Sequence, residues 1–155
     1  MQSQWERLRQ GDAALTEGMA RMAIPLLRVS LAITYIWFGA LKLAGRSPVA
    51  DLVNQTAPAL PKRWLVRTLG VWEVAIGVAL LLRVALRPTL LLFFLQLGGT
   101  FLTFLMQPGR MFQHGNPLLL TKDGEFVLKN LVLLAAGLAV GSTVRREDEK
   151  VPTED

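Results

Sequence analysis

Four long apolar blocks dominate the pattern of hydrophobic and polar positions along this chain. They run from about Met22 to Ala44, Leu65 to Leu86, Thr89 to Gln107 and Phe126 to Ser142. A helix rises about 1.5 Å per residue, so blocks of this length match the roughly 30 Å hydrocarbon core of a bilayer. The third block is the clearest, because it carries no charged residue. The pattern predicts an all-α protein, an integral membrane four-helix bundle.

The composition favours a membrane protein over a soluble helical domain. Hydrophobic residues make up 52% of the 155 residues and are gathered in the four blocks. A soluble domain with four such helices would have too little polar surface to stay in solution. The net charge of +5 does not indicate nucleic-acid binding, because basic residues at helix ends meet lipid head groups. We therefore expect the lipid bilayer as a partner and no nucleic acid.

Two polar ends flank the predicted transmembrane domain of residues 22–142. Residues 1–21 are polar and mixed in charge, which argues against a cleavable signal peptide. Trp5, Leu8, Leu15 and Met19 fall roughly on one side of a helix, so this segment is expected to form a short interfacial helix. Residues 143–155 form a charged tail with almost nothing to bury and are expected to be disordered.

The connections between the blocks predict how the helices are arranged. The sequence RVALRP separates the second and third blocks, with Pro88 at a natural helix start, so these helices should be antiparallel neighbours. The longer connections, residues 45–64 and 108–125, then share the opposite side. Eight Lys and Arg residues lie on the side of the termini against five on the side of the long connections, which favours cytoplasmic termini.

Each predicted helix carries its polar or small residues on one stripe. The first helix has Arg28, Ala32, Tyr35, Gly39 and Lys42 at spacings of four, three, four and three. The other stripes are Gly70, Glu73 and Gly77; Gln96, Gly99, Thr100, Thr103 and Gln107; and Asn130, Gly137 and Gly141. Small residues let membrane helices approach closely, so helix packing alone is one explanation of these stripes. Together they predict a bundle with a polar interior.

Glu73 is the residue that points most strongly to a function. A carboxylate in so apolar a span costs several kcal/mol unless it is paired or protonated. Lys42 ends the first predicted helix and Lys129 opens the fourth on the same side, so we expect both ammonium groups to converge on Glu73 and keep it ionised. This cluster has two explanations: a buried ion pair that fixes the fold, or a pocket for a head group or substrate.

Other polar residues have simpler explanations beside a functional one. Arg28, near the opposite membrane face, is an interfacial anchor or a site residue, and Gln96 is an interhelical hydrogen-bonding group or part of the pocket. His114 lies in a loop rich in Gly and Pro, as a solvated side chain or a proton-transfer group. The absence of Cys and the single His exclude a thiol relay, an iron–sulfur cluster and a bis-histidine haem, and no metal site is expected.

Short runs of this sequence resemble the DoxX-like family of small bacterial inner-membrane proteins. They are the L-R-x-S-L-x-I start around Arg28, the WFGALKL run from Trp37 to Leu43, the GVWEVAIG run around Glu73 and the KDGEFVLKN segment from Lys122 to Asn130. The resemblance covers about residues 26–141. It implies a four-helix bundle in a bacterial inner membrane, a link to quinone-coupled sulfur oxidation or oxidative stress, and characteristic polar positions at Arg28, Lys42, Glu73 and Lys129.

Two functions from different classes follow from these observations. The first is a non-catalytic membrane subunit that docks an oxidoreductase or binds quinone, with Lys42, Glu73, Lys129 and Asn130 near the head group and Tyr35, Trp37 and Trp72 beside the ring. The second is a small proton-coupled transporter in which Glu73 loads and unloads protons. The absence of an inverted repeat or broken helix in the four spans argues against a transporter, although a homo-oligomer could supply what one chain lacks.

Overall fold

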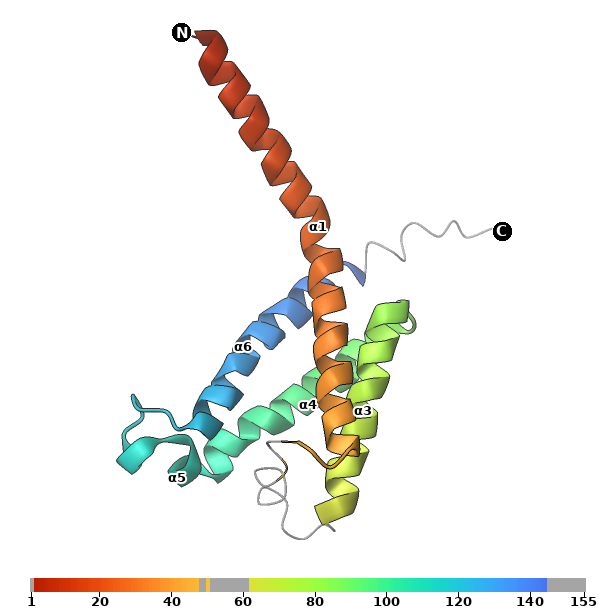
Figure 1. The fold of residues 1–155 in the computed structure, drawn as a ribbon, viewed down its shortest axis with the longest axis vertical. Helices are drawn as coiled ribbons and strands as arrows, with labels where there is room; N and C mark the ends of the chain where they lie inside the picture. The colour runs from red at the N-terminus through yellow and green to blue at the C-terminus, as the bar shows by residue number, and fades with distance from the viewer. Residues whose placement is uncertain (1, 48–49, 51–61, 145–155) are drawn as a thin grey trace, which may run out of the picture.

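The computed structural model describes residues 2–47, 50 and 62–144, and this part of the chain forms helices and no strand (Figure 1). The long helices are α1 (Gln2–Leu43), α3 (Lys62–Leu82), α4 (Leu86–Met106) and α6 (Lys122–Gly141). Two short helices, α5 (Pro108–Met111) and η1 (Gln113–Gly115), lie between α4 and α6. All four long helices are long and apolar enough to cross a membrane, so the predicted all-α bundle is confirmed.

The outer surface of the bundle is apolar on every long helix. Large exposed side chains include Ile33 on α1, Val78 on α3, Leu91 on α4 and Val132 on α6. A soluble domain rarely leaves apolar surface of this extent in water. Lipid chains around the four spans account for it, and we describe the chain as a multi-pass membrane protein.

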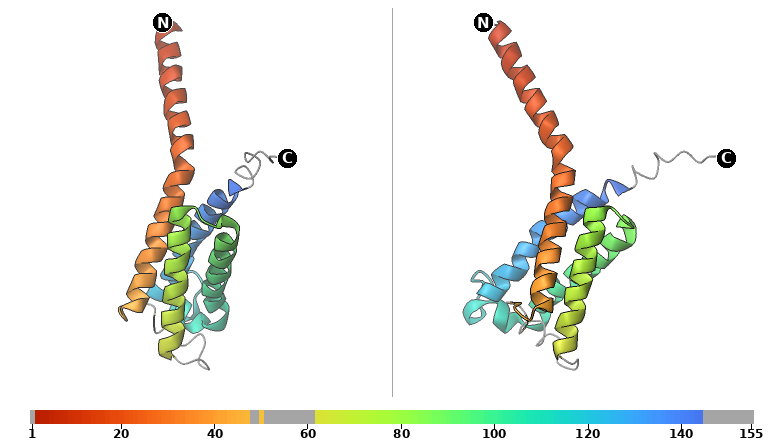
Figure 2. Two further views of the ribbon diagram at one scale, coloured as in Figure 1. Left: turned by 90° about the vertical axis from the view of Figure 1, so that its right-hand side faces the viewer. Right: turned by 45° about the vertical axis from the view of Figure 1, so that its right-hand side comes forward.

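Helix α1 is longer than the predicted first span. It runs without interruption over 42 residues, which corresponds to about 63 Å at 1.5 Å per residue. The polar N-terminal segment, expected as a short interfacial helix, is therefore a continuation of the first span, and it projects beyond the bundle (Figures 1 and 2). Pro25 lies inside α1, where its missing N–H explains the bend in the helix seen in Figure 2. Residues 145–155 of the predicted tail lie outside the described residues.

The four long helices contact each other in a closed ring. Helix α1 packs against α3 and α6, and α4 packs against α3 and α6. Three residues, Arg83–Ala85, join α3 to α4 and reverse the chain, since Arg83 and Ala85 both adopt a positive φ. Pro88 lies in the first turn of α4, where no intrahelical N–H is needed. The predicted antiparallel pairing of these two helices is confirmed (Figure 1).

Glycines set the close approach of α1 to α3. A Cβ atom on Gly39 would lie 2.7 Å from the carbonyl oxygen of Gly70, and one on Gly77 would lie 2.7 Å from the carbonyl oxygen of Ala32. Both contacts are with backbone, so neither glycine tolerates a side chain unless the helices separate. The two contacts fix one antiparallel register, in which Lys42 lies beside Gly70 on the stripe predicted to face inward.

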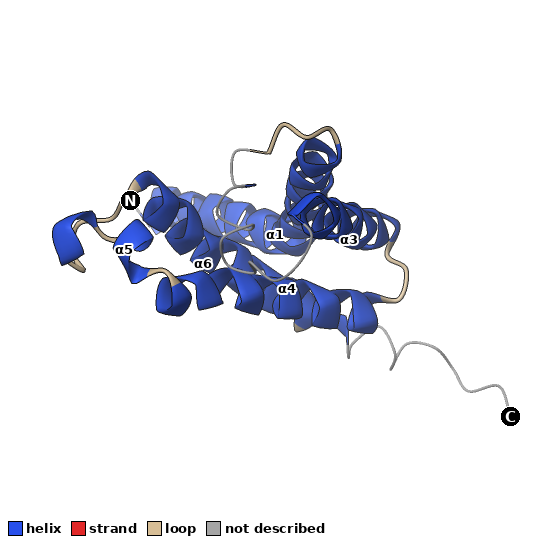
Figure 3. Cartoon of the chain, turned by 90° about the horizontal axis from the view of Figure 1, so that it is seen from below, coloured by secondary structure: helices blue, strands red, loops and turns tan. Residues whose placement is uncertain are grey.

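The well-packed core fills the part of the bundle nearest the short α3–α4 connection. It combines residues from all four spans, and the backbone of Gly137 on α6 is so close to the ring of Phe93 that a Cβ atom would lie 2.4 Å from it. Its largest fully buried side chains are Phe93, Leu31, Ile76, Leu80 and Val140. Figure 3 shows α1 beside α3 and α4 beside α6. A second, smaller cluster around Met111 and Val127 lies at the opposite end of the bundle.

Helix α6 begins four residues before the predicted start of the fourth span. The side chain of Thr121 accepts a hydrogen bond from the backbone N–H of Gly124, and Asp123 and Glu125 lie in the first turn, where acidic residues favour the helix dipole. Asp123 also forms an ion pair with Arg110 of α5 at 2.7 Å. Lys129 consequently lies two turns inside α6 and does not open it.

Candidate functional site

The predicted pairing of Glu73 with Lys42 is present in the structure. Glu73 lies eleven residues after the start of α3, at a depth of about 16 Å, and Lys42 is the last residue but one of α1. Side chains lean toward the N-terminus of their helix, so these two lean toward each other from antiparallel helices. Nζ of Lys42 lies 2.6 Å from Oε2 of Glu73, and the two side chains are only 6% and 7% exposed.

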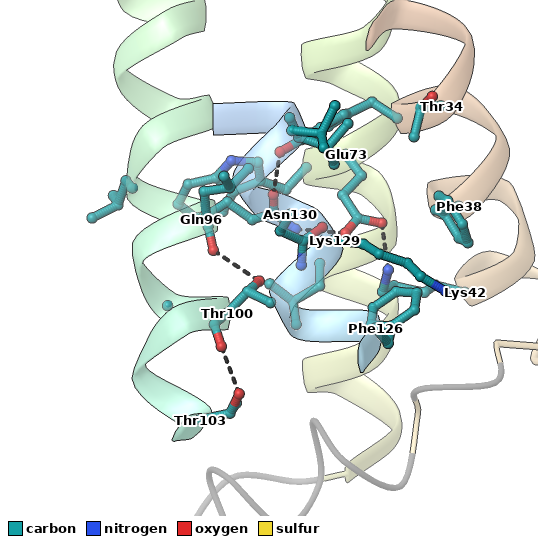
Figure 4. Close-up of a pocket in the computed structure, with 18 of the residues that line it drawn as sticks. Thr34, Phe38, Lys42, Glu73, Gln96, Thr100, Thr103, Phe126, Lys129 and Asn130 are labelled. Carbon is teal, nitrogen blue, oxygen red and sulfur yellow. Dashed lines mark hydrogen bonds and ion pairs between the residues drawn. The ribbon is translucent and has the colours of Figure 1, made fainter. Parts of the chain in front are cut away.

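A hydrogen-bonded chain extends from this ion pair to a third helix. Gln96 of α4 donates from Nε2 to Oε1 of Glu73 at 2.6 Å. The hydroxyl of Tyr35 on α1 donates to Oε1 of Gln96 at 2.8 Å. Both carboxylate oxygens and both ends of the amide are therefore engaged, and the chain of contacts links α1, α3 and α4 (Figure 4).

This polar chain borders a cavity of about 730 Å³ between the four spans. The cavity lies in the half of the bundle away from the short connection, beyond the well-packed core. Its polar lining comprises Thr34, Tyr35, Lys42, Glu73, Gln96, Thr100, Thr103, Lys129 and Asn130. The rest of the wall is largely apolar, with Phe38, Leu65, Leu69, Trp72, Leu95, Leu97, Phe126, Val132 and Leu133. The cavity is thus a predominantly apolar chamber with polar groups on all four helices.

Lys129 lines the cavity but does not form the predicted ion pair with Glu73. Each carboxylate oxygen of Glu73 is instead engaged by another side chain, Oε2 by Lys42 and Oε1 by Gln96. Lys129 projects from α6 beside Asn130, on the cavity side shown in Figure 4. In the part of the chain that the structure describes, no ion pair joins Lys129 to any acid.

Three other predicted site residues lie away from the cavity. Trp37 is 66% exposed on the outside of α1, because two residues after the inward-facing Tyr35 the helix has turned by about 200°. Arg28 is partly buried nearer the other end of the bundle and does not line the cavity. His114 is exposed in η1, in the loop between α4 and α6. Trp72, Tyr35, Gln96 and Asn130 do line it.

The aromatic part of the wall was not predicted from the sequence. Phe38 of α1 and Phe126 of α6 pack edge to face with ring centroids 6.0 Å apart, and both line the cavity. Phe38 lies three residues after Tyr35 and four before Lys42, so helical spacing alone would have placed it on the inward stripe. Phe126 carried no comparable signal, because its helix was predicted to begin there.

Comparisons with family models, curated proteins and solved structures found no match to this chain. The resemblance to the DoxX-like proteins therefore stays a prediction that depends on the short motifs quoted above. Within the described residues, no group of three or more His, Asp and Glu side chains gathers that could hold a metal ion. The cavity and the side chains that line it are the features of the described residues that indicate a function.

Proposed function

We propose that this protein is a non-catalytic membrane subunit that holds a quinone or another polar-headed lipid in the cavity between its spans. The observation that carries this proposal is the amphipathic lining of the cavity, with leucines and aromatic rings beside lysine, amide and hydroxyl groups. Small-molecule sites are typically apolar chambers of roughly 300–1,000 Å³ with a few convergent polar groups. The cavity of about 730 Å³ is in that range.

The Glu73 network has a positioning role in this proposal. Its hydrogen bonds are satisfied within the protein, so a ligand does not have to complete them. A fully satisfied buried network rigidifies its surroundings, and this one holds three helices at fixed distances around the cavity. The Lys42–Glu73 pair can therefore fix the fold and also shape the wall of a ligand pocket, so the two explanations are compatible.

Two adjacent glycines on α4 provide a matched test of the cavity. Gly98 and Gly99 are both exposed, and a Cβ atom on either would meet no atom within 4 Å, but Gly99 lines the cavity and Gly98 does not. We expect Gly99→Leu to weaken the binding of a short-chain quinone or lipid, because the new side chain takes up cavity space. Gly98→Leu should leave binding unchanged. Binding is measured by tryptophan fluorescence quenching in detergent, and equal affinities in both variants would contradict the proposal.

The cellular setting is part of the same proposal. The resemblance to DoxX-like proteins supports a bacterial inner membrane and a redox or oxidative-stress partner, and the excess of basic residues beside the termini supports cytoplasmic termini. The projecting N-terminal part of α1 would then extend on the cytoplasmic side, available to a peripheral oxidoreductase or a second copy of this chain (Figure 1). Native mass spectrometry of a mild detergent extract tests for a partner or a bound quinone.

A proton-coupled transporter is the second candidate, favoured by the depth of Glu73 and by its continuous chain of hydrogen bonds to Gln96 and Tyr35. Intramembrane acids in such chains relay protons in many transporters. This candidate predicts that proteoliposomes show a substrate flux that changes with pH and is lost in Glu73→Gln. A flux that stays flat across pH would exclude it.

A further inference from the structure

The charges around the cavity do not balance. Of the described residues that line it, three are charged: Lys42, Glu73 and Lys129. Lys42 and Glu73 neutralise each other at 2.6 Å. The cavity lining therefore carries one net positive charge, that of Lys129, and no acid in the described part of the chain compensates it.

The surroundings of Lys129 suit an anion better than a neutral group. It lies seven residues after the start of α6, about 10 Å into the span, and its side chain is exposed and not enclosed by protein. Within a membrane an ammonium at this depth is costly without a counterion. Asn130 is the next residue and lines the same cavity, so its amide offers additional N–H donors. A neutral carbonyl can accept a hydrogen bond from Lys129 but leaves its charge uncompensated, whereas an oxyanion does both.

Building on the proposed function, we propose that the cavity selects a lipid with an oxyanion head group, a carboxylate or a phosphate, and that Lys129 is the residue that binds this head group. Lys42 does not compete for the anion, because Glu73 already neutralises it. The apolar chain of the ligand then lies along the leucine-lined wall that α3 and α4 contribute, at Leu65, Leu69 and Leu95. The ligand supplies the counterion that the described residues do not.

Trp72 provides a local reporter for this test, because it lines the cavity while Trp37 and Trp64 are exposed on the outside. A variant that keeps Trp72 and carries Phe at the other three tryptophans is titrated with dibromostearate, whose bromines quench nearby indoles, and with its neutral methyl ester. A second variant that keeps Trp37 alone reports quenching by bulk lipid or detergent. We expect saturable quenching of Trp72 by the acid, with an affinity about tenfold higher than for the ester.

Charge variants then identify the residue responsible. Lys129→Gln should weaken binding of the acid about tenfold and leave the ester unchanged, while Lys129→Arg should retain the preference for the acid. Arg67→Gln is the matched control, because Arg67 is an exposed cation on α3 that does not line the cavity. Dibromo-lysophosphatidate in place of stearate distinguishes a phosphate head from a carboxylate head. Far-ultraviolet circular dichroism and gel filtration verify that each variant is folded.

The possible outcomes separate this inference from the function on which it depends. If acid and ester bind Trp72-only protein equally well, or if Lys129→Gln weakens both alike, the anion selectivity is refuted while a lipid-binding cavity stands. If neither compound quenches Trp72 saturably and a short-chain quinone also does not, the cavity binds no such ligand and the proposed function fails as well. An effect of Arg67→Gln equal to that of Lys129→Gln would assign the selectivity to general surface charge.

Discussion

Removal of one partner of the Lys42–Glu73 pair should destabilise the protein much more than removal of both. We consider three variants: Glu73→Gln, Lys42→Met and the double replacement. Glutamine keeps the shape of the Glu73 side chain and its contact with Gln96, and methionine keeps most of the length of the lysine stem. Either single change leaves one charge buried beside a neutral side chain, whereas the double change leaves no charge at all.

The magnitude follows from the burial of this pair. The two side chains are 6% and 7% exposed and their charged atoms are 2.6 Å apart, so water does not replace a lost partner. Leaving a buried charge without its partner costs about 3–5 kcal/mol, whereas replacing a whole buried pair by neutral groups of similar volume is often close to neutral. We therefore expect each single variant to lose about 3–5 kcal/mol and the double variant to lose less than either.

The assay is reversible unfolding of purified protein in mixed micelles, followed by circular dichroism as the fraction of denaturing detergent rises. A double-mutant cycle extracts the coupling between the two residues. Lys122→Met is the control, because Lys122 is exposed at the start of α6, and its loss should stay within about 0.5 kcal/mol. If the double variant loses the sum of the two single losses, the residues do not interact and the structure of the site is wrong.

Three further predictions concern the contacts around the site. Gly77→Ala should cost about 1–3 kcal/mol in the same unfolding assay, because its Cβ atom would meet the backbone of α1. The control Gly98→Ala has open space around it and should be neutral or slightly stabilising. Equal effects of the two replacements would contradict the α1–α3 register. Gln96→Leu should cost about 1–3 kcal/mol, because it leaves the hydroxyl of Tyr35 without its acceptor and removes a donor to Glu73. If the variant unfolds like the wild type, the hydrogen-bonded chain is refuted. Arg110→Gln should cost at most about 1 kcal/mol, because its ion pair is partly exposed to solvent; a larger loss in the unfolding assay would show that the loop before α6 is essential to the fold.

The sequence was sufficient for the parts of the fold that depend on period and hydrophobicity. The four spans and the inward stripe of α1 follow from helical spacing, and the pairing of Lys42 with Glu73 follows from the cost of a lone charge in lipid. The length of α1 did not follow, because the polar N-terminal segment has no apolar block to mark it. Its helix is an extension of a span that is already formed, and helix propagation is easier than nucleation.

The choice of Lys42 over Lys129 as the partner of Glu73 illustrates what periodicity cannot decide. Residue spacing placed both lysines on the correct side of the bundle, but it did not rank them. The choice depends on the α1–α3 register fixed by Gly39 and Gly77, which sets Lys42 within 2.6 Å of Glu73, and on Gln96 reaching the second carboxylate oxygen. Such a register depends on backbone contacts of the order of an ångström, which a pattern of residue types does not contain.

The position of the polar chain also explains why the bundle contains a cavity. Glycines bring α1 and α3 together, and Gly137 brings α6 onto Phe93 of α4, but Gly98 and Gly99 meet no other helix. Helices α3 and α4 are held by their short connection and by the bond from Gln96 to Glu73. Beyond that bond Gly99, Thr100 and Thr103 of α4 line the cavity between the four spans. Glu73, the acid that is costly in lipid, therefore lies where the well-packed core ends and the cavity begins. Its hydrogen bonds hold α1, α3 and α4 together at this boundary.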